Sequence, residues 1–94
     1  MMNDLAALHA IAQGRVQGVN YRAFVSRNAA SLGVTGTVHN LPDNSVEITA
    51  EGDKKQLQKL ADRLKQGPPG ARVDNLELSW TGYTGQYSDF SVTG

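Results

Sequence analysis

Glycine and arginine residues gather in one short segment, Gly14–Arg22, where an apolar stretch gives way to a helical pattern. The segment has little side-chain bulk at its centre and an arginine near each end. Backbone N–H groups at a helix N-terminus lack partners within the helix, and the helix dipole favours negative charge there. Arg22, in the first turn, adds a planar guanidinium that suits phosphate oxygens. The segment therefore predicts an anion-binding loop.

A plainer interpretation of the same segment stands beside this one. Glycines between a strand and a helix are common, so Gly14 and Gly18 are also typical of a simple turn, with Arg22 as a solvated surface residue. On spacing alone the two interpretations carry equal weight. An arginine at a helix N-terminus is electrostatically misplaced if its role is only structural, which favours a bound anion. Neither G-x-x-x-x-G-K-S/T nor G-x-G-x-x-G is present, so we expect a phosphate-bearing ligand smaller than a nucleotide.

Asn40 is the second candidate, and the order of elements brings it near the loop. A right-handed strand–helix–strand connection makes the strands over 5–13 and 34–41 parallel, so both end at the sheet edge where the intervening helix begins. Asn40 shares the parity of Val38 and should face the helices, where it can orient a water or a substrate oxygen. Taken alone, an asparagine before Leu-Pro-Asp-Asn is more often a turn residue.

Hydrophobic periodicity predicts the elements that position these residues. Apolar residues at helical spacing predict a helix over 21–32, with Asn20 as its N-cap and Gly33 at its end. A second helix follows Asp53, whose side chain should cap it, and stops at Gly67–Gly70. Its buried stripe is expected to be Leu57, Leu60, Ala61 and Leu64. Alternating apolar residues predict strands over 5–13, 34–41, 46–51 and 76–80, with a short final extension at Phe90 and Val92.

The order strand, helix, strand, strand, helix, strand predicts one α+β domain over residues 1–94. Its natural closure is a ferredoxin-like sandwich, an antiparallel four-stranded sheet with both helices on one face. Such a fold supports many functions and does not by itself indicate one.

The positions of the charged residues are more informative about a binding site than the net charge is. Nine Lys and Arg balance nine Asp and Glu in 94 residues, which argues against non-specific nucleic-acid binding. No acidic residue lies between Asp4 and Asp43, whereas Arg15, Arg22 and Arg27 all fall in that stretch. The predicted loop and Asn40 therefore share an electropositive segment.

Composition narrows the chemistry further. The chain has no cysteine, which excludes disulfides and thiolate nucleophiles and is compatible with a reducing cytosol. His9 and His39 have the parity that faces away from the helices, so we interpret them as surface residues and expect no metal cage. Glu47 and Glu51 are expected to be solvated strand residues. Met1–Leu5 carries no basic or long apolar run, so we expect no leader, no membrane span and a cytoplasmic protein.

Two motifs in this sequence resemble those of a known family. Gly14–Arg22 resembles the first signature of the acylphosphatases, G-x-V-Q-G-V-x-F/Y-R, and Gly36–Glu47 resembles their second, built around G-x-V-x-N and an acidic turn. The similarity continues through Gly67–Val73 and covers about 80 residues in the predicted order of elements. Asn44 stands where the family usually has glycine, and asparagine tolerates the left-handed backbone of such a turn. Phe90–Gly94 lacks the family's basic or aromatic ending, which leaves the pairing of the last strand open.

The resemblance implies hydrolysis of the carboxyl–phosphate bond of small acyl phosphates. It implies that Asn40 positions the attacking water and that Arg22 binds the phosphoryl group. Backbone N–H groups would assist Arg22, from Gln17, Gly18, Val19, Asn20 and Tyr21. The family implies no metal and no cofactor, a monomer, a small-molecule substrate with inorganic phosphate as product, and no nucleic-acid or membrane partner.

Two functions of other classes compete with this one. A ferredoxin-like binding module would hold a phosphate or carbamoyl-type ligand without turning it over, and the same motifs occur as a domain of larger carbamoyl-transfer proteins. An RNA-recognition module of similar topology should carry basic and aromatic residues on its third strand. Residues 46–51 read Val-Glu-Ile-Thr-Ala-Glu, so this last class is excluded.

Overall fold

The computed structural model describes residues 4–93. It contains five strands and two helices, in the order β1 (Leu5–Arg15), α1 (Tyr21–Leu32), β2 (Thr35–Asn40), β3 (Val46–Asp53), α2 (Lys54–Gln66), β4 (Arg72–Thr81) and β5 (Phe90–Val92). The expectations about the N-terminal leader and the final residue fall partly on residues 1–3 and on Gly94, which lie outside this range. The predicted order of elements is confirmed, and the ends of the four predicted strands differ from the predicted ends by at most four residues.

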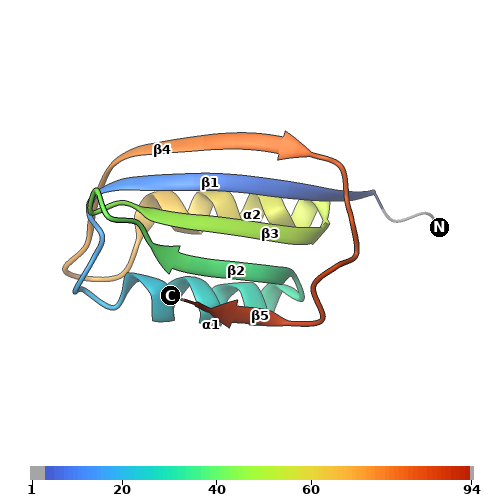
Figure 1. Ribbon diagram of the computed structural model, residues 1–94, viewed down its shortest axis with the longest axis horizontal. Helices are drawn as coiled ribbons and strands as arrows, with labels where there is room; N and C mark the ends of the chain where they lie inside the picture. The colour runs from blue at the N-terminus through green and yellow to red at the C-terminus, as the bar shows by residue number, and fades with distance from the viewer. Residues whose placement is uncertain (1–3, 94) are drawn as a thin grey trace.

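The strands form one sheet in the order β4-β1-β3-β2-β5 (Figure 1). β3 lies antiparallel between β1 and β2, so β1 and β2 run in the same direction, as the right-handed crossover predicts. The prediction of four strands, all antiparallel, was wrong in one respect. Phe90–Val92 is a fifth strand, paired parallel to β2 at the edge opposite β4. A parallel pair requires a crossover, and three residues give no sequence signal for one.

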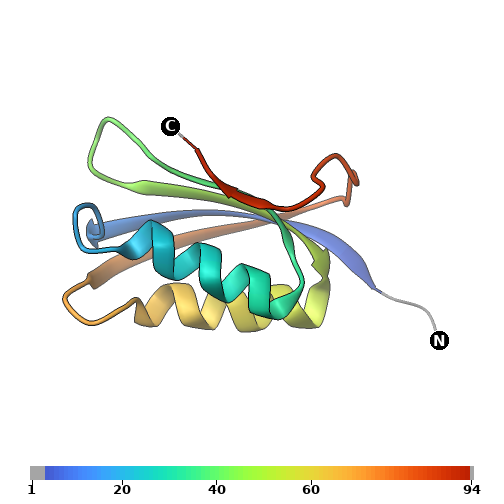
Figure 2. The ribbon, with the colours of Figure 1, turned by 90° about the horizontal axis from the view of Figure 1, so that it is seen from below.

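Both helices cover one face of the sheet and enclose the core between the two layers (Figure 2). Every second residue of the central strands points into this layer and is fully buried, as Leu8, Ala10 and Ala12 of β1 show. The predicted stripe of α2 is buried at Leu57, Leu60, Ala61 and Leu64. Period-two strands packed against an amphipathic helix account for this core.

The chain ends its helices where the sequence indicated. Gly33 has a left-handed backbone, with φ of 71°, and its N–H donates to the last turn of α1. The Asp53 carboxylate accepts a hydrogen bond of 2.9 Å from the N–H of Lys55 and caps α2. The phenol of Tyr21 donates to the carbonyl of Leu64 at 2.8 Å, which ties the start of α1 to α2 inside the core.

Glu51 corrects the expectation of a solvated carboxylate, because only 2% of its surface is exposed. It alternates along β3 with the buried core residues Ile48 and Ala50, so it faces away from the helices. On that face residues 82–89 cross from β4 at one edge of the sheet to β5 at the other (Figures 1 and 2). Its carboxylate accepts hydrogen bonds from the N–H and hydroxyl of Thr84, at 3.1 and 2.7 Å, and from the N–H of Gly85 at 2.9 Å. The crossing segment therefore covers Glu51 and supplies the donors that a buried carboxylate requires.

Replacing Glu51 by alanine removes the acceptor of three charge-assisted hydrogen bonds, so we expect the free energy of unfolding to fall by about 2–4 kcal/mol. Urea unfolding followed by circular dichroism measures it. Glu77→Ala, which removes an exposed carboxylate from β4, is the matched control and should change stability by less than about 0.5 kcal/mol. Equal effects of the two substitutions would contradict a structural role for Glu51.

Candidate active site

The predicted loop overlaps the end of β1, since Gly14 and Arg15 still pair with β4. The register between β1 and β4 shifts at Gln13 and Gly14, and a side chain at Gly14 would place its Cβ 2.2 Å from the carbonyl oxygen of Arg72. Beyond it, Gly18 and Asn20 have left-handed backbones, with φ of 73° and 64°. Alternation of the sign of φ along a short segment turns successive N–H groups toward one concave side, the arrangement that binds anions.

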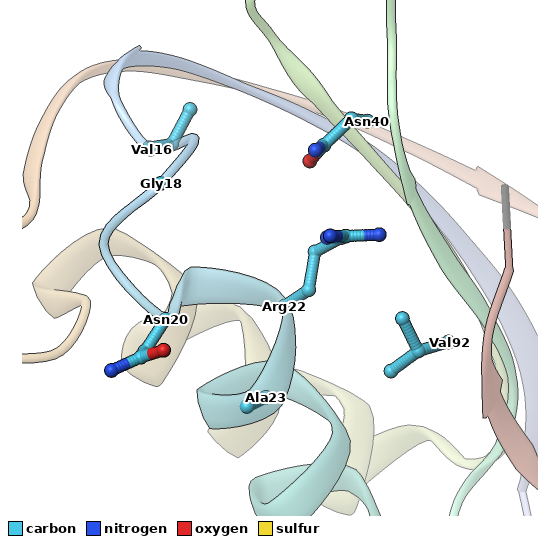
Figure 3. Close-up of a pocket in the computed structure, with 7 residues that line it drawn as sticks. All are labelled: Val16, Gly18, Asn20, Arg22, Ala23, Asn40 and Val92. Atoms are coloured by element: carbon cyan, nitrogen blue, oxygen red, sulfur yellow. The ribbon is translucent and has the colours of Figure 1, made fainter.

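Asn20 occupies the N-cap position of α1 but does not cap it. No hydrogen bond runs from its side chain to the helix. The reason is its left-handed backbone, since a capping side chain reaches the N–H groups of the first turn from an extended one. Figure 3 shows the Asn20 side chain directed away from Arg22. The expected cap is therefore absent, and the first-turn N–H groups of α1 are left without a side-chain acceptor.

A cavity of about 330 Å³ opens between this loop, α1, the end of β2 and β5. It brings together four residues that the sequence singled out, Gly18, Asn20, Arg22 and Asn40, although they come from three separate segments. In Figure 3 the side chains of Arg22 and Asn40 point into the same space from opposite sides. The remaining lining residues are Val16, Ala23 and Val92.

Two polar groups that point into this cavity, the Arg22 guanidinium and the Asn40 Oδ1 atom, lack protein partners within residues 4–93. The ion pairs within residues 4–93 join His9 and His39 to Glu47 and Arg72 to Asp74, so none includes Arg22. The Oδ1 atom of Asn40 is buried, and across the same residues it is the one buried side-chain oxygen or nitrogen without a hydrogen-bond partner. A buried polar atom without a partner costs about 1–3 kcal/mol, so it marks a place where a ligand or water is expected to bind.

The other predicted loop residues have their side chains elsewhere. The Gln17 amide donates to the carbonyls of Leu41 and Ser45, each at 2.9 Å. Tyr21 is buried beneath the loop, and burial raises the pKa of its phenol. Val19 is partly buried against the core. Their side chains do not line the cavity, so any contact of Gln17, Val19 and Tyr21 with an anion would come from the backbone.

Val92 is the lining residue that lies outside the predicted loop and helix, and the sequence did not indicate it. It belongs to β5 and is 47% exposed, yet it forms the wall of the cavity beyond Arg22 (Figure 3). Its alternation with Phe90 was visible, but nothing local predicts which strand this segment would join. Only the parallel pairing with β2, in which Val92 lies beside Val38, brings it to the site.

The histidines lie on the opposite face of the sheet, as their parity predicts. Glu47 accepts from both, through contacts of 2.7 Å to Nε2 of His9 and 2.9 Å to Nε2 of His39. Glu47 is therefore partly buried between two partners, which corrects the expectation of a simply solvated strand residue. The hydrogen bond from His9, followed by the charges of both imidazoles, lowers the pKa of Glu47.

The turn after Asn40 has its own local support. The N–H and hydroxyl of Ser45 both donate to Oδ1 of Asp43, and these bonds lower the pKa of that carboxyl. Asn44 has the left-handed backbone expected of it, with φ of 74°. The Asn at this position therefore keeps the turn that glycine makes in the family's motif.

Comparison with known proteins decides the family. The acylphosphatase family model matches residues 8–92. An acylphosphatase of Methylococcus capsulatus is 46% identical over 85 residues, which make up 90% of this chain and 92% of that protein. The chain belongs to the acylphosphatase family. It is a hydrolase, and the family implies an acyl phosphate as substrate and phosphate as product.

Solved structures agree with this assignment. The crystal structure of acylphosphatase from Bacillus subtilis superposes with a TM-score of 0.92 at 32% identity and covers 95% of this chain and 99% of that one. Full-length HypF, in its phosphate- and nucleotide-bound form, superposes with a TM-score of 0.86 at 25% identity, but this chain spans only 12% of it. The ferredoxin-like α+β fold is therefore confirmed.

Two further observations concern membrane-spanning helices and metal sites. Within residues 4–93 no helix is long and apolar enough to cross a membrane. The same part of the chain holds no group of three or more His, Asp or Glu side chains arranged to hold a metal ion.

The lowered pKa of Glu47 predicts how the enzyme's stability depends on pH. In the unfolded chain this carboxyl titrates near 4.5 and in the folded protein below that value. Its contribution is therefore present above 4.5 and is lost as the pH falls through the folded pKa. Urea unfolding should find Glu47→Gln less stable than wild type at about pH 6, with the difference shrinking by about pH 3. Asp62→Asn, on an exposed position of α2, is the control, and a Glu47→Gln difference that grows on acidification would contradict the assignment.

Proposed function

We propose that the cavity is the phosphoryl-transfer site, in which Arg22 and the backbone N–H groups of residues 17–21 bind the phosphoryl group and Asn40 orients the attacking water. The observation that carries the proposal is the facing pair of unpartnered side chains, the Arg22 guanidinium and the buried Asn40 Oδ1. One is a cation without a carboxylate, and the other is an acceptor without a donor. A phosphate dianion and a water satisfy both at once.

The loop supports this assignment of the anion. Asn20 does not cap α1, so the positive end of the helix dipole is available to a ligand. No acidic side chain lies in the first turn of α1 or among the cavity's lining residues. Phosphoryl transfer depends mainly on positioning and on stabilising charge at the non-bridging oxygens, which one arginine and oriented backbone donors can provide.

The leaving group explains why no acid is needed. A carboxylate has a conjugate acid with a pKa of about 4 to 5, so it leaves at neutral pH without receiving a proton. The water oxygen bonds to phosphorus as the bond from phosphorus to the acyl oxygen breaks, and the electron pair of that bond departs on the carboxylate. Both water protons remain with the phosphate product. Asn40 need only accept a hydrogen bond from the water and hold it in line.

The proposal extends to the domain organisation, cellular location, oligomeric state and metal dependence of the enzyme. We propose that residues 1–94 act as one domain, as a cytoplasmic monomer and without a metal. Every polar group invoked above comes from a single chain, and the mechanism gives each of them a role that needs no Lewis acid.

Removing either polar side chain should abolish most of the hydrolysis of acetyl or benzoyl phosphate. We expect Arg22→Met and Asn40→Ala to lower kcat/KM by about 10²–10³-fold, the usual effect of losing a group that acts in the transition state. The assay follows substrate loss with purified protein in the presence of a chelator. His39→Gln, on the other face of the sheet, should retain wild-type activity.

The outcomes separate the candidate functions. An inactive wild-type protein that still binds phosphate would indicate a binding module without turnover. Full activity in either variant would remove that residue from the mechanism, and activity lost to the chelator but restored by a metal would overturn the metal-free step.

Inorganic phosphate should compete with the substrate, because it carries the same charge and oxygens as the transferred group. We expect its inhibition constant to rise by at least about tenfold in Arg22→Met, since one charge-assisted pair is worth about that factor. Steady-state inhibition at constant ionic strength, with chloride as the control anion, measures it. A rate that high phosphate leaves unchanged would place the anion elsewhere.

A further inference from the structure

Two segments that are distant in sequence meet beside the cavity. The loop over 16–20 contributes lining residues, and the turn over 41–45 directly follows the lining residue Asn40. Within the part of the chain that the structure describes, the side-chain hydrogen bonds between them both come from Gln17. Its Nε2 donates to the carbonyl of Leu41 at 2.9 Å and to the carbonyl of Ser45 at 2.9 Å. Gln17 is partly buried, so these bonds are shielded from competing water.

The chemistry of this contact is specific to an uncharged amide. The turn already closes on itself through Leu41 N–H to the Ser45 carbonyl, at 2.8 Å, and Asn44 N–H to the Leu41 carbonyl, at 3.2 Å. Each carbonyl thus uses one lone pair inside the turn and offers the other to Gln17. A primary amide supplies two hydrogens from one nitrogen, whereas a carboxylate supplies none and would face two carbonyl oxygens.

The contact lies one residue from the proposed water-positioning group. Leu41 follows Asn40 directly, so the bond to the Leu41 carbonyl fixes the backbone that carries the Asn40 amide. The donor belongs to the same loop whose N–H groups are proposed to hold the phosphoryl group. Both hydrogens of Nε2 are occupied, so the side chain of Gln17 has none left to donate to a phosphate oxygen.

We infer that the Gln17 side chain is a positioning residue, which holds Asn40 at a fixed offset from the loop and thereby aligns the water with phosphorus. This inference rests on the proposed function. Misplacing a reacting group by about 1 Å can cost about 10²-fold in rate, so a link of two hydrogen bonds at this point affects the chemical step. Phosphate binding depends on Arg22 and the loop N–H groups, which the link does not supply.

A double-mutant cycle tests whether Gln17 acts through Asn40. Gln17→Met keeps the length of the side chain and removes both donors. We expect it to lower kcat by about 10–100-fold in the wild-type background while changing the inhibition constant of inorganic phosphate by less than about threefold. In the Asn40→Ala background, where nothing remains to be positioned, the same substitution should change kcat by less than about threefold. An equal loss in both backgrounds, or a loss confined to phosphate binding, would overturn the inference.

Gln17→Glu provides a second test that does not depend on Gln17→Met being well folded. Ionised, this nearly isosteric side chain has no hydrogen to donate, but its protonated form regains one. The kcat of Gln17→Glu relative to wild type should therefore rise as the pH is lowered toward the carboxyl pKa, with urea unfolding at each pH checking that both proteins are folded. A ratio that stays constant or falls on acidification would contradict the positioning role.

The two proposals fail in different ways. If the proposed function is wrong, the wild-type protein does not hydrolyse acyl phosphates or Asn40→Ala retains activity. If only the role of Gln17 is wrong, both of those results stand as proposed and the Gln17 variants match wild type or show the same loss in both backgrounds.

Discussion

The handedness of one crossover determines where everything else in this protein lies. Because β1 and β2 are parallel with β3 between them, the end of β1, the start of α1 and the end of β2 all meet at one edge of the sheet. The residues proposed to bind an anion at the N-terminus of α1 are thereby brought opposite Asn40, which ends β2. Had the connection been left-handed, α1 would lie on the other face of the sheet, and Arg22 would be on the opposite side of the sheet from the Asn40 side chain.

The candidate site also contains polar groups that have no hydrogen-bond partner in the protein. A capped helix N-terminus and a paired Asn40 amide would each stabilise the fold, yet Asn20 adopts a left-handed backbone and the Asn40 Oδ1 has no partner. Unsatisfied groups of this kind are costly unless a ligand completes them. Elsewhere in residues 4–93 the buried side-chain oxygens and nitrogens have hydrogen-bond partners, and the buried carboxylate of Glu51 has three donors.

Local patterns were enough to predict most of the fold and that Arg22 and Asn40 lie near each other in the candidate site. Period-two strands, the stripe of α2, the Gly33 terminus and the Asp53 cap are all properties of short segments, and parity correctly turned Asn40 toward the helices and His39 away from them. The failures share a different cause. They depend on the path that residues 82–89 take across the sheet, which no local pattern predicts. That path determines the burial of Glu51, the pairing of β5 and the position of Val92 at the cavity. The missing Asn20 cap depends on a backbone conformation that its residue type permits but does not require.

The wall of the cavity that β5 forms is held less firmly than the walls formed by α1 and β2. Arg22 and Asn40 stand on a twelve-residue helix and on an inner strand, whereas Val92 is half exposed and belongs to a three-residue strand at the sheet's edge. Short edge segments open at a far lower free energy than the core. The wall that Val92 forms is therefore the part of the cavity most readily displaced, whereas the side chains proposed to bind the phosphoryl group and the water stand on a helix packed against the core and on a strand paired on both sides.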